Sequence, residues 1–323
     1  MSRNRFVATR LTSAEASDLW SRSDQASAFT RPDYLEQLVD EVEWWGADRS
    51  GEVVAAWPLV RAVAGGEIGP PPFCYYVGPM FARSLSEDKY LRYWTSYTNS
   101  LSVLADTLAR THARFRFSLP VGLVDVRPLE WWNFDHPGQP HFDVAPRFTA
   151  RIDLSEFPDD AALYESFARD RRRHVKRWTQ TPTTMVEHVP TQRVIELHDG
   201  ALRRSGAAIH PDRHTALRRI LRLVENGAGV TVGVVPPGAT EIEAAIVLLH
   251  GPDESNNVLC VASDAWREEG LTAWVVWQGL LRARSLGKRW FDFNGANSPG
   301  RAADKHFYGA RAEMYFNCSF GAK

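Results

Sequence analysis

The stretch from residue 271 to residue 315 has the most regular pattern of hydrophobic and polar positions in the chain. Apolar side chains recur there at helical spacing, which predicts a helix with one face in a core. They are Trp274, Trp277, Leu280 and Leu281. Gly287 stands where a helix end commonly needs a positive φ. The apolar segment 290–293 then predicts a short buried strand, and a loop rich in Gly, Asn and Pro leads to a short helix and a second strand.

The rest of the second half alternates between helical and strand patterns. We expect helices at 159–167, 169–180, 191–205 and 211–225, and strands at 183–188, 230–235, 242–250 and 256–263. Turn signals separate the last three strands, so these strands are expected to form an antiparallel meander.

The first half shows the same kinds of pattern. We expect strands at 6–10, 44–48, 53–60, 74–77, 115–119 and 147–154, and helices at 13–21, 32–42 and 84–112. Ser13 is the expected N-cap of the first helix, and 121–138 is predicted to be a loop. The fold class is therefore α+β, with mixed, mostly antiparallel sheets flanked by helices. The similar layout of the halves suggests two domains, 1–150 and 151–323.

Composition narrows the class of protein. The chain has 323 residues, 44% of them hydrophobic, which is enough for two packed cores. It has no apolar run of about twenty residues and no apolar segment near its start, so we expect neither a membrane span nor a signal peptide. Cys74, Cys260 and Cys318 are scattered and fit reduced thiols in the cytoplasm. Because the net charge is only −1, an RNA partner would need a local basic patch.

Lys305 and Asp292 are the candidate catalytic residues. A lysine beside a buried strand could stabilise a developing oxyanion or bind a phosphate, or it could simply face solvent. An aspartate at the end of a buried strand could orient a substrate amine or accept its proton, or it could cap the following loop through an Asx turn. Asn294 and Phe307, which follow these residues closely, are further candidate site residues.

Residues 169–178 carry six Arg or Lys side chains within nine positions. Four of them share a broad face of the predicted helix, namely Arg169, Arg173, Lys176 and Arg177. Like charges on one helix repel, so an anionic partner is expected to offset them, and phosphates are the obvious candidate. The alternative is a solvated face paired with Asp159, Asp160 and Glu165.

Residues 125–132 place charged and aromatic side chains in a predicted loop, where such residues seldom serve packing alone. Arg127 suits a carboxylate or phosphate of an acceptor. Asp125, Trp131 and Tyr76 complete the expected acceptor side. Alternatively, Asp125 and Arg127 pair with each other and the tryptophans cover a domain junction.

Several other chemistries have little support. Ser298 precedes Pro299, which has no N–H for an oxyanion hole, so a serine hydrolase is not expected. His210 and His214 lack the glutamate of a zinc motif, and no metal or cofactor is expected. A partial match to a phosphate loop, R-x-x-G-x-G/A, at 267–272 is the one feature that favours a CoA donor.

The segments DFNGA (292–296) and DKHFYGA (304–310) resemble the signature of the Fem-like (FemABX) transferases, DfxGa followed by fKxxFGa. These transferases belong with the GNAT superfamily of acyltransferases. The resemblance extends over nearly the whole chain, including the basic segment 169–178. Two positions depart from the signature: Asp304 replaces an aromatic residue before the lysine, and Tyr308 replaces phenylalanine.

The resemblance implies two GNAT-like domains without a coiled-coil arm, with the acceptor side in 1–150 and the donor side and catalytic signature in 151–323. It implies transfer of an aminoacyl group from aminoacyl-tRNA to the amine of a peptide-like acceptor, either a peptidoglycan precursor or a peptide natural product. An acyl-CoA-dependent N-acyltransferase and a non-catalytic RNA- or peptide-binding module are the alternatives. A cytoplasmic monomer is expected.

Overall fold

The computed structural model describes residues 6–321, which form two compact units. The first unit contains the described residues up to Arg147 together with those from Met314 onward, and the second is Phe148–Glu313. Two strands, β6 (Phe142–Asp153) and β12 (Arg311–Phe320), run from one unit into the other. The C-terminal part of β12 pairs with β5 (Phe115–Ser118), so this division differs from the predicted one in its C-terminal segment.

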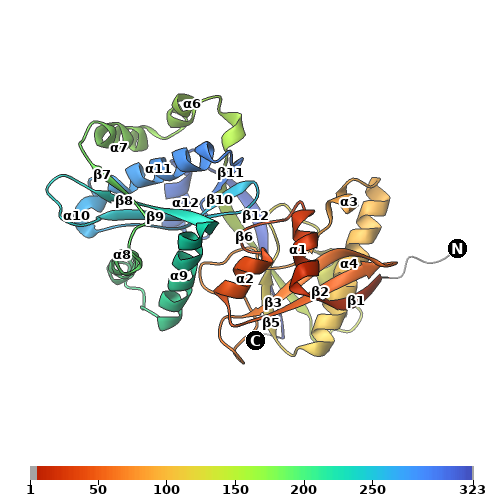
Figure 1. The fold of residues 1–323 in the computed structure, drawn as a ribbon. Helices are drawn as coiled ribbons and strands as arrows, with labels where there is room; N and C mark the ends of the chain where they lie inside the picture. Colours follow the sequence, from red (N-terminus) through yellow and green to blue (C-terminus); the bar gives the residue numbers. More distant parts are fainter. Residues whose placement is uncertain (1–5, 322–323) are drawn as a thin grey trace. The chain divides into compact units, whose positions relative to one another are not determined.

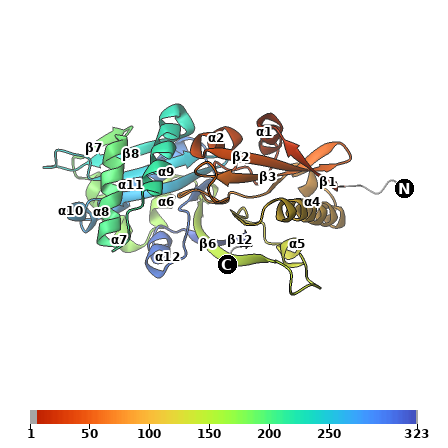
Figure 2. The same cartoon turned by 90° about the horizontal axis from the view of Figure 1, so that it is seen from below.

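The first unit is built on an antiparallel sheet of four strands. In spatial order they are β1 (Phe6–Leu11), β2 (Glu41–Arg49), β3 (Glu52–Arg61) and β4 (Met80–Phe81). The long helix α4 (Tyr90–Thr111) packs on one face of this sheet, and α1 (Ser13–Ser21) and α2 (Pro32–Leu38) pack on the other (Figure 2). The buried rings of Trp57, Phe115 and Phe117 lie at the centre of its core.

Two helix boundaries in this unit differ from the prediction. The expected N-cap Ser13 is wrong, because Thr12 accepts the Glu15 N–H at 3.2 Å and Glu15 accepts the Thr12 N–H at 2.7 Å, a reciprocal capping box. The second helix ends at Leu38 because the chain from Glu41 onward pairs with β3.

Three further expectations in the first unit are wrong in part. The single helix expected at 84–112 is two helices, α3 (Arg83–Ser86) and α4, separated by an extended Lys89. Residues 74–77 form no strand, since Phe73 and Tyr76 have φ of 67° and 55°, which a sheet ladder does not accept. The predicted loop at 121–138 contains one helical turn, α5 (Arg127–Glu130).

The second unit has a sheet covered by helices on both faces. Its strands, in spatial order, are β6, β11 (Trp290–Asp292), β10 (Glu254–Ala262), β9 (Ala244–His250), β8 (Gly229–Val235) and β7 (Thr184–Glu187), with the start of β12 beside β6. Strands β8, β9 and β10 form the predicted antiparallel meander. Strand β11 runs parallel to β10 and pairs with it only over Glu254–Asn256.

Helices α11 (Leu271–Ser285) and α7 (Arg169–Thr179) cover one face of this sheet, and α8 (Thr191–Arg204) and α9 (Pro211–Leu223) cover the other (Figure 1). The remaining helical segments of the unit are η1 (Leu154–Glu156), α6 (Asp160–Glu165), η2 (Val224–Ala228), α10 (Asp264–Arg267) and α12 (Pro299–His306). None of the helices between residues 6 and 321 is long and apolar enough to span a membrane.

The predicted stop of α11 at Gly287 is confirmed. Gly287 has φ of 68° and donates its N–H to Arg284 at 2.8 Å, while Lys288 donates to Ala283 at 3.0 Å. These two hydrogen bonds form a Schellman motif, which requires the left-handed conformation at the glycine. The motif directs the chain from α11 into β11 and hence into the candidate site.

We expect Gly287→Ala to lower the free energy of unfolding by about 1 kcal/mol, because an L-residue is strained in the left-handed backbone conformation. The added Cβ itself would meet open space, so no clash contributes. Gly200→Ala is the matched control: Gly200 lies inside α8, also faces open space, and its replacement should stabilise by about 0.5–1 kcal/mol. Urea unfolding of both variants measures the difference. Equal stability of the two variants would contradict the capping role.

Candidate functional site

Asp292 is the last residue of β11 and its side chain is only 2% exposed. Its Oδ1 accepts hydrogen bonds from Thr149 Oγ1 at 2.6 Å and from the backbone N–H of Asn294 at 2.7 Å. Its Oδ2 lies 3.6 Å from Arg151 Nε. The bond to Asn294 is the Asx turn that the sequence offers as one alternative. The carboxylate is therefore held in place from two strands, as a buried charge requires.

Asn294 sets the path of the loop that follows β11. It has φ of 54°, and its Nδ2 donates to the backbone oxygen of Asn257 in β10 at 3.0 Å. Its Oδ1 is buried and has no hydrogen-bond partner among the described residues. The loop is thus tied to the neighbouring strand, and one side-chain oxygen is left for another donor.

Lys305 lies in the last turn of α12 and is half-buried. Its ammonium donates to the backbone oxygens of Asn294 and Gly295, the latter at 2.6 Å. Burial lowers the pKa of Lys305 to about 8, and the negative charge of Asp292 partly opposes this effect. The structure therefore brings Lys305, Asp292 and Asn294 together, and Lys305 points into the protein rather than into solvent.

Helix α7 lies against α12 in the same unit. The Arg171 guanidinium forms an ion pair with Asp304 and stacks over the rings of Phe307 and Tyr308, at 5.6 Å and 5.4 Å from their centroids. The Ala168 N–H also donates to the Phe307 oxygen at 2.8 Å. Asp304 and Tyr308, the two departures from the Fem-like signature, are therefore both contacts of α7. Phe307 itself is 47% exposed.

The cations of α7 differ in how far their charge is already balanced. Arg177 pairs with Glu269 at 2.5 Å, and Arg173 lies 3.6 Å from Asp170. Arg169 and Lys176 are exposed and have no ion pair among residues 6–321. The alternative names Asp159, Asp160 and Glu165 as partners of these cations. Of the three, only Glu165 forms an ion pair with this helix, through Arg172 at 2.5 Å.

The predicted acceptor residues lie in the first unit. Asp125 and Arg127 form a bidentate ion pair, with bonds of 2.8 Å and 2.6 Å, which lowers the pKa of Asp125. The Arg127 guanidinium also stacks near Trp131, which is about half exposed. Tyr76 is buried against other aromatic rings. The pairing alternative is thus realised, and the proposed contact with an acceptor stays a prediction.

Thr149, Arg151 and Asn257 were not among the predicted site residues. Thr149 and Arg151 alternate along the predicted strand 147–154, and two polar positions at a spacing of two on a strand mark one polar face. That pattern could have identified them. Asn257 had no such signal, because its backbone oxygen, and not its side chain, contacts the site.

No metal centre is found in the described part of the chain, where no three His, Cys, Asp or Glu side chains are grouped suitably. His214 instead contacts Asp199 at 2.7 Å through its Nε2.

The fold is shared with several solved structures. FemX has a TM-score of 0.65 and 12% identity, covering 96% of both chains. A tandem GNAT protein from the clavulanic acid biosynthesis pathway has a TM-score of 0.57 and 12% identity, covering 99% of both. L-PGS from Bacillus licheniformis has a TM-score of 0.56 and 10% identity, covering 96% of this chain and 91% of the other. No protein-family model and no curated protein matches the sequence.

At such low identity these likenesses show the fold alone. The chain has the α+β fold of FemX and of tandem GNAT proteins, as the sequence predicts.

We expect Lys305 to titrate near pH 8 and Asp292→Asn to lower its pKa further, because the substitution removes the negative charge that favours the ammonium. The chain has only five lysines, so NMR of ¹³Cε-labelled lysine can resolve each one. The ¹³Cε signal of Lys176, which is exposed on α7, is the internal control and should be the same in the variant and the parent protein. Titration of Lys305 near its ordinary value, or no change in the variant, would contradict this electrostatic coupling.

Proposed function

We propose that the chain is an acyltransferase that moves an aminoacyl group from aminoacyl-tRNA to the amine of a peptide-like acceptor. The observation that carries the proposal is the contact between α7 and α12, through Arg171 and Asp304. It joins a helix with exposed cations to the helix that holds Lys305. An aminoacyl-tRNA needs cations that contact its phosphates and, close by, a group that stabilises the reacting ester at its end.

The chemistry needs no nucleophile from the protein. The acceptor nitrogen attacks the ester carbonyl, the C–N bond forms, the C–O bond to the tRNA 3′ oxygen breaks, and that oxygen takes up the proton lost by the amine. The negative charge that develops on the carbonyl oxygen is stabilised by a fixed cation, for which Lys305 is the candidate. Asp292 is the candidate for orienting the amine or accepting its proton.

The start of α11 supports an RNA donor over a CoA donor. A phosphate loop needs open backbone N–H groups at a helix start. Here the His174 imidazole packs directly on Gly270, so that even a Cβ there would collide with it. Trp178 Nε1 donates to the Glu269 backbone oxygen at 3.0 Å, and the Glu269 carboxylate pairs with Arg177 of α7 at 2.5 Å. Helix α7 therefore covers the place where a pyrophosphate would bind.

The donor class is tested by mixing the protein with aminoacyl-tRNAs carrying labelled amino acids, or with labelled acetyl-CoA, and an amine-bearing peptide mixture. We expect labelled, base-stable amide product from the tRNA donors only. Lys305→Met should lower the rate roughly 100-fold, because the cation is lost from the site. Lys89→Met, which changes an exposed lysine, is the matched control and should leave the rate unchanged.

Transfer from acetyl-CoA alone would favour the N-acyltransferase alternative. An undiminished rate in a folded Lys305→Met variant would remove Lys305 from the reaction. Absence of any transfer, together with tight tRNA binding, would favour the non-catalytic binding module.

Binding of tRNA by α7 predicts a defined salt dependence. Arg169→Gln and Lys176→Gln should each make the plot of log K against log salt concentration shallower by about 0.7–0.9, the amount for one lost phosphate contact. Arg172→Gln in the same helix is the matched control, because the Arg172 charge is already balanced by Glu165 at 2.5 Å. Fluorescence anisotropy of labelled tRNA at increasing KCl measures the slopes. Unchanged slopes in the first two variants would exclude this helix as an RNA contact.

A further inference from the structure

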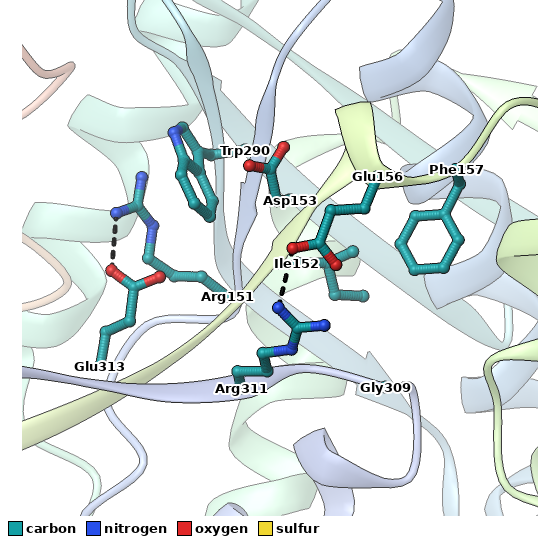
Figure 3. A pocket seen from close by; sticks show the side chains of 9 residues that line it. All are labelled: Arg151, Ile152, Asp153, Glu156, Phe157, Trp290, Gly309, Arg311 and Glu313. Carbon is teal, nitrogen blue, oxygen red and sulfur yellow. Dashed lines mark hydrogen bonds and ion pairs between the residues drawn. The ribbon is translucent and has the colours of Figure 1, made fainter.

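A small pocket opens on the second unit next to Asp292. Its volume is about 80 Å³. One water needs roughly 10–15 Å³, so the pocket has room for a group of several non-hydrogen atoms. Its polar lining comes from β6, η1, β11 and β12 (Figure 3). The residues that matter for the argument are Arg151, Asp153, Glu156, Trp290, Arg311 and Glu313.

The register of the strands explains why these side chains meet. Asp153 lies opposite Trp290, and Arg151 lies opposite Asp292, so all four side chains project from one face of the sheet. Between them, Phe291 is buried in the hydrophobic core, and Ile152 belongs to the same core while also bordering the pocket. One face thus supplies packing, and the other supplies a polar surface that packing does not require.

The pocket is lined by two ion pairs, one between Arg151 and Glu313 and one between Arg311 and Glu156 (Figure 3). Glu313 accepts from Arg151 at 3.1 Å through Oε2, and Glu156 accepts from Arg311 at 2.7 Å through Oε1. The second oxygen of each glutamate has no hydrogen-bond partner within residues 6–321. Asp153 is already engaged by Arg289 at 2.9 Å.

The charges at the opening can still reach a ligand. The side chains of Arg311 and Glu156 are 74% and 42% exposed, so either can turn toward an incoming group. The Arg151 guanidinium is less mobile, because it lies flat over the Trp290 ring at 4.2 Å from the centroid. The pocket thus offers two carboxylates and two guanidinium groups, and the charge of its third carboxylate, Asp153, is balanced by Arg289.

We propose that this pocket binds an α-amino acid head group, in which an ammonium and a carboxylate are attached to one carbon. The ammonium would contact the second oxygens of Glu313 and Glu156, and the carboxylate would contact Arg311. A zwitterion can contact groups of both signs without adding net charge, whereas a ligand with only one of the two charges makes fewer contacts and leaves the half-buried site with a net charge. A pocket lined by both signs therefore selects zwitterions.

The pocket is coupled to the candidate catalytic residues through one side chain. Arg151 contacts Glu313 by Nη1, and its Nε lies 3.6 Å from Asp292 Oδ2. A ligand that binds Glu313 changes the electrostatic potential at Arg151, and hence at Asp292. Under the proposed function, this head group would be the end of the acceptor, and that part rests on the proposed function. Binding of a free amino acid does not depend on it.

Isothermal titration calorimetry with alanine as the probe tests the proposal directly. We expect alanine to bind, and N-acetylalanine and alaninamide, which each lack one charge, to bind at least 10-fold more weakly. Glu313→Gln and Arg311→Gln should each weaken alanine binding at least 10-fold, the effect of losing one charged hydrogen bond. Because Arg311 is exposed, its variant should fold normally, which a thermal unfolding curve verifies.

Glu67→Gln is the matched control, since Glu67 forms an exposed ion pair with Arg116 in the first unit and should not affect alanine binding. Failure of alanine to bind, equal binding of the singly charged analogues, or unchanged binding in the folded Glu313 and Arg311 variants would each overturn the proposal. Alanine binding without any transfer from aminoacyl-tRNA would leave the head-group site standing and reject the proposed function. Transfer without alanine binding would support the proposed function and reject the head-group site.

Discussion

The burial of one carboxylate, that of Asp292, is the constraint on which the candidate site depends. A charge with 2% exposure must find donors within the protein. Thr149 supplies one from β6, and the backbone of Asn294 supplies another. The second bond requires a tight turn at the end of β11, with Asn294 at positive φ. That turn also presents the two backbone oxygens that hold Lys305, so the carboxylate and the lysine are placed by the same loop.

Charge balance extends this arrangement along one face of the sheet. The positive charge of Lys305 lies near Asp292, Asp292 lies near Arg151, and Arg151 pairs with Glu313. Each charged group has a neighbour of opposite sign, which lowers the cost of burying them together. A change in the charge of any one of these groups therefore changes the electrostatic potential at the next one. Changes of charge at Lys305 and at Glu313 are linked in this way through Asp292 and Arg151.

The elements that could be predicted from the sequence are those whose pattern is local. The meander, α7, α11 and the glycine that ends α11 each follow from hydrophobic period or turn chemistry within a few residues. The capping residue of α1 and the break at Lys89 depend on single hydrogen bonds and backbone angles, which a pattern of apolar positions does not contain. The failed strand at 74–77 shows the same limit, since its apolar residues pack without entering a ladder.

The candidate site could be predicted only where its residues lie close together in the sequence. Lys305, Asp292 and Asn294 lie within fourteen positions of one another and were identified together. Thr149 is separated from Asp292 by 143 positions, and no local pattern connects them. Arg151 and Glu313 are 162 positions apart. Their meeting is a consequence of strand order, so it becomes visible only when β6, β11 and β12 are seen side by side.

The departures from the Fem-like signature bear on how many cations of α7 are left unpaired. Asp304 takes up one cation of α7 through Arg171, and other carboxylates take up Arg172, Arg177 and, at 3.6 Å, Arg173. Of the six cations, Arg169 and Lys176 are left without an ion pair among the described residues. So few free charges neutralise only a few phosphates, and their contribution falls with salt. Under the proposed function, α7 would therefore contact only a few phosphates of the RNA, and specificity would have to come from groups beside the reacting ester.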